Sequence, residues 1–155
     1  MDCNSVNMQK YANYKEQSKR LNRAMSNEFY LEALFIEFAI IEDRVDSVLR
    51  YEDNQIKSDK FVSIDKKLKK IIKIAEHKNS LPNKYFSDGI IEKILDFKEE
   101  RNRMIHALMK QQLTTVELQN LALRGKELSN ALCRKSTNYK RSVERRNIIK
   151  NKPNE

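Results

Sequence analysis

The chain has almost none of the residues that turn a polypeptide sharply. It contains 2 glycines and 2 prolines among 155 residues. Sheets and barrels need many tight turns, so this scarcity argues against all-β and α/β folds. Hydrophobic residues make up 39% of the chain and charged residues 34%, which is typical of helices with one buried and one solvated face. We therefore predict an all-α protein.

Apolar residues recur at helical spacing in several parts of the chain. The second of these parts includes Phe35 and Phe38 in its main stripe and is apolar on more than one side, which is typical of a helix at the centre of a bundle. We predict an antiparallel bundle of four to five helices. The five helical parts are about residues 7–24, 26–51, 64–77, 87–110 and from 114 onward.

Polar residues that can cap a helix precede several of these segments. Ser26 or Asn27 is predicted to cap the second helix, Ser63 the third, and Ser87 or Asp88 the fourth. These side chains can accept hydrogen bonds from the free N–H groups of a first helical turn. They therefore fix where we expect each helix to begin.

Other local signals separate the helices. Residues 52–62 are polar and predict a loop, and the run LPN at 81–83 predicts a break before the fourth helix. Thr114 and Glu117 have the spacing of a capping box, which predicts the start of the fifth helix. Gly125 lies on the apolar face of that helix, where it would let a neighbouring helix approach closely.

Positive charge is concentrated near the C-terminus. The chain has a net charge of +9, and residues 134–155 hold eight Lys or Arg against two Glu. We expect a helical domain at 1–135 and a basic tail at 136–155 that either stands apart or extends the last helix. Such a tail attracts polyanions such as RNA, although a solvated helix end would look the same. The candidate RNA-binding residues are Lys140, Arg141, Arg145 and Arg146.

The sequence gives little sign of metal, cofactor or membrane. Cys3 and Cys133 are far apart and neither has a metal-ligand spacing, so we expect two free thiols in a reducing cytoplasm. No apolar run reaches membrane-spanning length, and the N-terminus has no signal-peptide pattern. We therefore expect a cytoplasmic protein with no metal, no cofactor and no membrane partner.

A polar string interrupts the apolar stripe of the fourth predicted helix. Residues 101–106 read RNRMIH. Arg101 can hold a phosphate, His106 can move a proton near neutral pH, and Asn102 can orient either one. The competing interpretation is a surface Arg beside a lone His. Five residues at 100° each leave Arg101 and His106 about 140° apart on an ideal helix. Either the helix is distorted there, or two copies of the motif meet across a two-fold axis.

These residues suit RNA cleavage by the 2′-hydroxyl, which needs a base, an acid and a cation but no metal. His106 would serve as base or acid, and Arg101 would neutralise the phosphate. Arg103 is a weaker second cation that would add RNA binding. Glu42 and Asp43 could support Arg101 or His106, or could form a solvated helix end.

The string Arg-Asn-x-x-x-His at 101–106, on a late helix of a small all-α bundle, resembles the Arg-x4-6-His motif of the HEPN superfamily. By helix order the resemblance covers about residues 26–135. It implies a metal-independent endoribonuclease that acts as a homodimer, often a toxin or antiviral effector with an antitoxin or other regulatory partner. Many such toxins carry a Tyr two residues after the His, which a nucleotidyltransferase modifies. Leu108 occupies that position here, so we do not expect that partner.

Two other functions fit parts of the sequence. A non-catalytic RNA- or protein-binding module, such as an antitoxin or a degenerate HEPN adaptor, would use the basic tail without any chemistry. DNA binding through the C-terminal helix is the third possibility, and it is weakened because the tail has no apolar seam for dimerisation.

Overall fold

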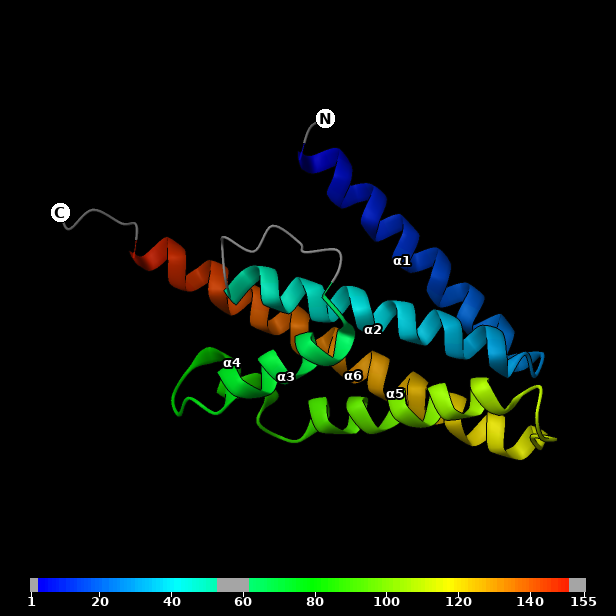
Figure 1. Cartoon of the computed structure of the whole chain (residues 1–155). Coiled ribbons are helices and arrows are strands. Elements are labelled where there is room, and N and C mark those ends of the chain that lie inside the picture. Colours follow the sequence, from blue (N-terminus) through cyan, green and yellow to red (C-terminus); the bar gives the residue numbers. More distant parts are fainter. Residues whose placement is uncertain (1–2, 53–61, 151–155) are drawn as a thin grey trace.

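The computed structural model describes residues 3–52 and 62–150, and within these ranges it contains six helices and no strand (Figure 1). The predicted all-α fold is confirmed. The predicted loop at 52–62 lies largely outside the described residues. The helices are α1 (Cys3–Ser26), α2 (Tyr30–Glu52), α3 (Ile64–Ala75), α4 (Leu81–Phe86), α5 (Ile90–Ala107) and α6 (Thr115–Lys150).

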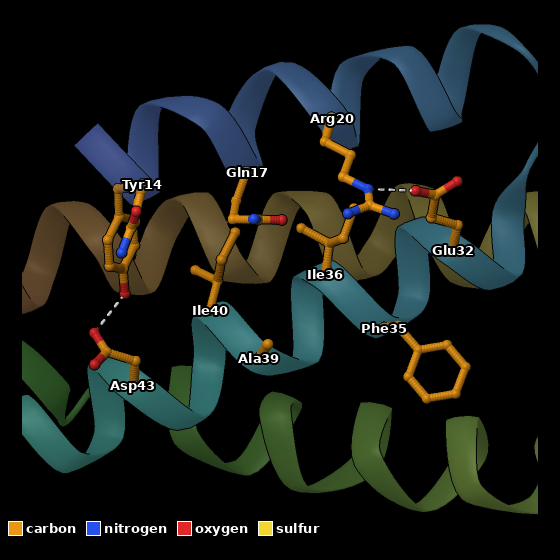
Figure 2. Close-up of a pocket in the computed structure, with 10 residues that line it drawn as sticks. Tyr14, Gln17, Arg20, Glu32, Phe35, Ile36, Ala39, Ile40 and Asp43 are labelled. Carbon is orange, nitrogen blue, oxygen red and sulfur yellow. Dashed lines mark hydrogen bonds and ion pairs between the residues drawn. The ribbon is translucent and has the colours of Figure 1, made fainter. Parts of the chain in front are cut away.

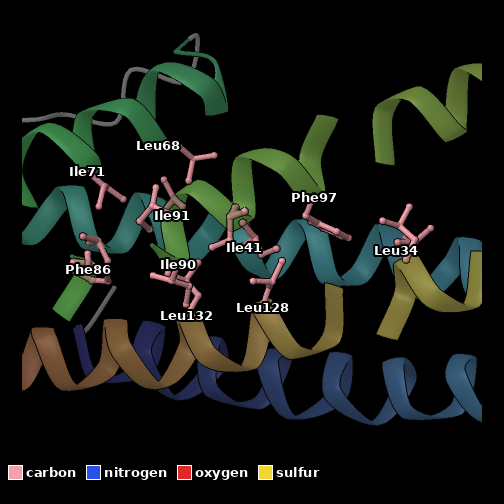
Figure 3. Close-up of a cluster of buried hydrophobic side chains, with 14 of the residues drawn as sticks. Leu34, Ile41, Leu68, Ile71, Phe86, Ile90, Ile91, Phe97, Leu128 and Leu132 are labelled. Carbon is pink, nitrogen blue, oxygen red and sulfur yellow. The ribbon is translucent and has the colours of Figure 1, made fainter. Parts of the chain in front are cut away.

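Helices α2 and α6 form the long central pair of the bundle (Figure 1). Each buries an apolar stripe because its apolar residues recur at helical spacing. At a rise of 1.5 Å per residue, the 36 residues of α6 make a helix about 54 Å long. Side chains from α3, α4 and α5 complete the core on one side of this pair (Figure 3). Helix α1 packs mainly on α2, and its N-terminal half diverges from the bundle.

The connection from α1 to α2 differs from the prediction. Helix α1 continues through Ser26, so neither Ser26 nor Asn27 caps α2. The chain reverses instead in a short turn in which Glu28 has a positive φ of 60°. The backbone N–H of Phe29 donates to the carbonyl of Ala24 over 2.8 Å and closes the turn. A left-handed residue at a helix end reverses the chain in this way.

The predicted break at 81–83 is a short helix. Proline is tolerated in the first turn of a helix, where its missing N–H would have no partner, and Pro82 lies in the first turn of α4. Ser80 caps this turn, since its hydroxyl accepts a hydrogen bond from the Asn83 N–H over 3.1 Å. LPN therefore begins a helix rather than separating two of them.

The fourth predicted helix begins later than expected. Gly89, and neither Ser87 nor Asp88, occupies the N-cap position of α5, with a φ of 79°. Glycine adopts this backbone conformation without strain. The Asp88 carboxylate pairs with Lys135 of α6 over 2.7 Å and also accepts from the backbone N–H of Ile90 in the first turn of α5.

Three predictions from the sequence are confirmed. Ser63 is the N-cap of α3, although its side chain makes no capping hydrogen bond. Thr114 and Glu117 form the reciprocal capping box at the start of α6, with bonds of 2.9 and 3.2 Å. Gly125 lies at a close helix contact, because a Cβ there would overlap side chains of α2 and α5.

The bundle has two distinct ends (Figure 1). The α1–α2 turn and the connection from α5 to α6, residues 26–30 and 107–115, lie together at what we call the motif end. Residues 64–86 and 134–150, which form α3, α4 and the C-terminal half of α6, lie at the cationic end. No helix in the described part of the chain is long and apolar enough to cross a lipid bilayer.

Candidate functional site

Arg101 projects from α5 and lies against the aromatic surface of α2. Its guanidinium carbon Cζ is 4.6 Å from the centre of the Phe38 ring and 5.0 Å from the centre of the Phe35 ring. A cation over an aromatic ring is attracted by the ring quadrupole, and each such contact is worth about 0.5–1 kcal/mol at a partly exposed site. The two rings hold the guanidinium without occupying its hydrogen-bond donors.

Asn102 provides the one hydrogen bond that Arg101 makes within the described ranges. Nη1 of Arg101 donates to Oδ1 of Asn102 over 3.1 Å, whereas the buried Nε has no acceptor. Burial lowers the pKa of Arg101, and the Glu42 carboxylate opposes that shift. An arginine stays charged in a protein, so the guanidinium keeps free donors for an anion while Asn102 orients it.

His106 lies in the last turn of α5 and is exposed to solvent. Helix α5 is continuous over Ile90–Ala107, so the helix distortion considered for this motif is not observed. Arg101 and His106 therefore remain about 140° apart around the helix axis. One subunit does not bring them together, whereas Asn102, four residues before His106, shares a face with it.

The two acidic residues late in α2 have different surroundings. Glu42 is exposed and close enough to Arg101 to act on its charge. Asp43 faces α1, where it accepts hydrogen bonds from Lys10 Nζ over 2.7 Å and from Tyr14 Oη over 2.6 Å. Burial alone would raise the pKa of Asp43, but these contacts lower it. Glu42 is thus placed to support Arg101, whereas Asp43 is committed to the contact between α1 and α2.

The basic residues of the predicted tail lie on α6, which is continuous to Lys150. Residues 136–150 extend the bundle helix, and Tyr139 is buried there with its ring 5.5 Å from that of Phe86. Lys140 lies over the Tyr51 ring, 5.3 Å from its centre. The exposed cations of this stretch are Arg141, Arg145 and Arg146.

The basic stretch and the motif lie at opposite ends of the bundle (Figure 1). Helix α6 starts near the end of α5, and Arg141 follows its first residue by about 39 Å of helix. Arg134, Arg141 and Arg145 share one exposed face of α6 through their spacing of seven and four residues. None of the three has an ion-pair partner in the part of the chain that the structure describes. Arg134 was not among the predicted RNA-binding residues.

Glu37 is a buried acid that the sequence prediction missed. It is fully buried where α2 meets α5 and α6, and neither carboxyl oxygen has a hydrogen-bond partner. Burial raises the pKa of Glu37 to about 9, against a smaller opposing effect of Lys126. Its carboxyl group fills the space beside Gly125 and the Phe97 ring. The sequence does contain a sign of this buried acid, because Glu37 lies four residues before Ile41 and therefore within the most apolar stripe of the chain.

Within the described ranges, no three His, Cys, Asp or Glu side chains gather as a group that could hold a metal ion.

Similarity to known proteins adds nothing to this site. The HEPN resemblance rests on the motif and the helix order alone. No protein-family model matches the chain, and no curated protein or solved structure is significantly similar to it.

Proposed function

We propose that this protein is a homodimeric, metal-independent endoribonuclease of the HEPN type. The main support for the proposal is the arrangement around the Arg101 guanidinium. Two rings hold it, Asn102 orients it, and some of its hydrogen-bond donors stay free. A guanidinium fixed in this way suits a phosphate that gains negative charge in a transition state. His106 follows on the same helix and is open to solvent, so RNA can reach it.

The reaction needs only groups that the motif contains. A neutral His106 takes the proton of the 2′-hydroxyl, and the 2′-oxygen attacks the adjacent phosphorus. The bond from phosphorus to the 5′-oxygen then breaks, and that oxygen receives a proton from a second, protonated imidazole. The products carry a 2′,3′-cyclic phosphate and a 5′-hydroxyl. Arg101 stabilises the negative charge on the phosphorane oxygens.

Two copies of the motif are proposed to form one catalytic site. A two-fold axis near α5 would bring Arg101 of one copy towards His106 of the other, and would supply both imidazoles. Apolar side chains that face solvent at the motif end would be covered in such a dimer. These are Phe29, Leu108 and Met109, which are 59%, 36% and 96% exposed.

RNA affinity is proposed to come from both ends of the bundle. Arg103 is exposed on α5 and would add a phosphate contact near the motif. At the cationic end, exposed cations of α6 would neutralise phosphates without reading sequence. About 39 Å of helix separates the start of α6 from Arg141, so an RNA that reaches both ends must extend over at least that length. The proposed contacts on α6 are Arg134, Lys140, Arg141, Arg145 and Arg146.

The HEPN resemblance favours a cytoplasmic toxin or antiviral effector that an antitoxin or another regulatory partner holds in check. Leu108 stands where a modifiable Tyr would lie in many two-gene systems. We therefore propose control by a binding partner rather than by nucleotide transfer to the motif.

The divergence of Arg101 and His106 within one subunit favours a second candidate function. If the protein acts as a monomer, its motif is incomplete, and its cationic end suits a non-catalytic RNA- or protein-binding module. Such a module would bind RNA and leave it intact.

Incubation of the protein with total cellular RNA and tRNA in EDTA tests the two functions. The parent should cleave RNA, and Arg101→Ala and His106→Ala should not, with unchanged helical circular dichroism. Arg50→Ala and His77→Ala are matched controls, since both residues are exposed and lie outside the motif, in the last turn of α2 and just after α3. Binding without cleavage supports the module. Cleavage that requires Mg²⁺ contradicts the metal-independent mechanism.

A further inference from the structure

A groove runs between α1 and α2 beside the proposed catalytic motif (Figure 2). Its volume is about 530 Å³, within the range of roughly 300–1,000 Å³ that ligand sites occupy. Ile36, Ala39 and Ile40 of α2 form an apolar floor, and Asn13 and Gln17 of α1 place side-chain amides on the wall. The groove thus combines a large apolar surface with a few polar groups.

Polar pairs close the groove at both ends (Figure 2). At one end Arg20 Nε donates to Glu32 Oε1 over 2.6 Å, and at the other Tyr14 Oη donates to Asp43 Oδ2 over 2.6 Å. Glu32 and Asp43 are about 16 Å apart along α2. Gln17 lies between the two pairs and Asn13 lies next to Tyr14, and neither side-chain amide has a hydrogen-bond partner among the described residues. Their donors and acceptors are therefore available to a ligand.

Phe35 connects this groove to Arg101. The ring lines the groove, lies 5.0 Å from the Arg101 guanidinium carbon and is 59% exposed. Helix α1, which forms the other wall, carries five Lys or Arg residues and one Glu. The surroundings thus favour an anionic ligand with a flat apolar part, because an anion can reach Arg101 while a ring lies in the groove.

We propose that the groove binds a nucleobase of the RNA whose phosphate lies at Arg101. The base would lie on the apolar floor beside Phe35, and its polar edge would meet the amides of Asn13 and Gln17. This inference rests on the proposed ribonuclease function and deepens it. We expect RNA to be single-stranded at the cleavage site, since an unpaired base enters a groove without the cost of breaking a base pair.

Binding of single nucleotides to the whole protein tests this site. By calorimetry, the four nucleoside 5′-monophosphates should bind unequally, and the best should bind about tenfold more tightly than ribose 5-phosphate. Ala39→Phe fills the groove from α2 and should remove this advantage. Ala12→Phe adds the same bulk at an exposed position of α1 outside the groove and should preserve it. Gln17→Ala should reduce the difference among the four bases.

Two results would overturn the base site: ribose 5-phosphate binding as tightly as every nucleotide, or Ala39→Phe binding nucleotides as the parent does. A parent dimer that dissociates only in Ala39→Phe would place a second copy in the groove and would also overturn it. If Ala39→Phe does not fold, the base selectivity of Gln17→Ala decides the matter.

Cleavage assays distinguish failure of this inference from failure of the proposed function. If RNA cleavage needs His106 but the parent and Ala39→Phe have the same base preference, only the proposed base site in the groove is wrong. If Ala39→Phe abolishes nucleotide binding but the parent never cleaves RNA, only the proposed ribonuclease function is wrong.

Discussion

The two ends of the bundle carry positive charge in different ways. At the motif end, a single guanidinium is fixed by the Phe35 and Phe38 rings. At the cationic end, several arginines extend into solvent along one face of α6. A fixed cation favours one geometry of a phosphate, whereas solvated cations act on any polyanion through their total charge. Under the proposed function, chemistry would depend on the motif end and general affinity on the cationic end.

The largest effect should follow from variants at the motif end. Arg101→Ala and His106→Ala should each lower the rate of RNA cleavage by about 10³-fold, because proton transfer and transition-state charge contacts each contribute about 10²–10⁴-fold. Arg101→Lys should also lose most activity, since an ammonium lacks the planar fork and stacks less well on rings. Single-turnover cleavage of a fluorescent RNA measures these rates. Activity within tenfold of the parent in both alanine variants would show that the motif is not catalytic.

The next largest effect is on the stability of the fold and comes from Glu37, which lies where α2 and α6 meet, between the two ends of the bundle. The folded-state pKa of Glu37 is raised from 4.5 to about 9, so the folded protein retains a proton that the unfolded chain releases. The contribution of Glu37 to stability is therefore greatest below about pH 4.5 and falls as the pH rises towards 9. By pH 7 this single group should cost about 3 kcal/mol of the free energy of unfolding.

Glu37→Gln tests this pH dependence because glutamine keeps the shape and does not titrate. Relative to the parent, the variant should gain about 3 kcal/mol in free energy of unfolding between pH 4.5 and pH 7. Urea unfolding at both pH values measures the change. Glu127→Gln, at an exposed position of α6, is the control. A difference between variant and parent that stays constant with pH would mean that Glu37 is ionised in the folded protein.

A smaller effect is expected from charge reversal at the cationic end. Replacement of Arg134, Arg141 and Arg145 by Glu should weaken binding of a long RNA by about 10- to 100-fold at low salt, and should flatten its salt dependence. Cleavage at saturating RNA should be unchanged, since the motif end is untouched. The affinity can be measured by fluorescence anisotropy over a salt series.

A control with the same change of charge sharpens that experiment. Lys66, Lys69 and Lys73 are exposed on α3 at the same end of the bundle. Their replacement by Glu should weaken RNA binding less than the α6 variant does. Equal losses would show that total charge, and not the aligned face of α6, attracts the RNA.

The smallest effect concerns the rings that hold Arg101. Phe38→Leu should reduce cleavage by about twofold to fivefold, because it removes one cation–π contact worth about 0.5–1 kcal/mol. The loss should appear in kcat, and the urea midpoint should also fall, because Phe38 packs against the core. Tyr11→Leu removes an exposed ring from α1 and should leave the rate unchanged. A Phe38 variant as active as the parent would show that Asn102 alone orients Arg101.

The sequence predicted those structural features that depend only on residues close together in the chain. Helical periodicity is set within each segment, so the all-α fold and most helix positions followed from it. The capping box at Thr114 and Glu117 was also readable, because both partners lie within one turn. The α1–α2 turn was mispredicted because Glu28, a non-glycine residue, has a positive φ there. Helix α4 was mispredicted although its local signals, the Ser80 cap and Pro82 in the first turn, are present in the sequence.

The candidate site could be predicted only in part from the sequence, because its residues come from different helices. Arg101 stood out as a polar residue in an apolar stripe, but its ring partners are far from it in sequence. Phe35 and Phe38 were both placed in the main apolar stripe; Phe38 does pack against the core, whereas Phe35 is 59% exposed. Periodicity shows which face is apolar and not what covers it, so the contact of both rings with Arg101 was not predicted. The separation of the motif from the basic residues was equally hidden, since it depends on α6 being a single helix from Thr115 to Lys150.

The shared space of Gly125 and Glu37 restricts how this chain can evolve. A Cβ at position 125 would overlap the Glu37 carboxyl group and the Phe97 ring, and overpacking of this kind costs about 1–3 kcal/mol or more. A descendant sequence can therefore acquire alanine at position 125 readily only if both the Glu37 side chain and the Phe97 ring give way. A substitution at position 125 thus depends on changes at positions 37 and 97, and the three positions should vary together.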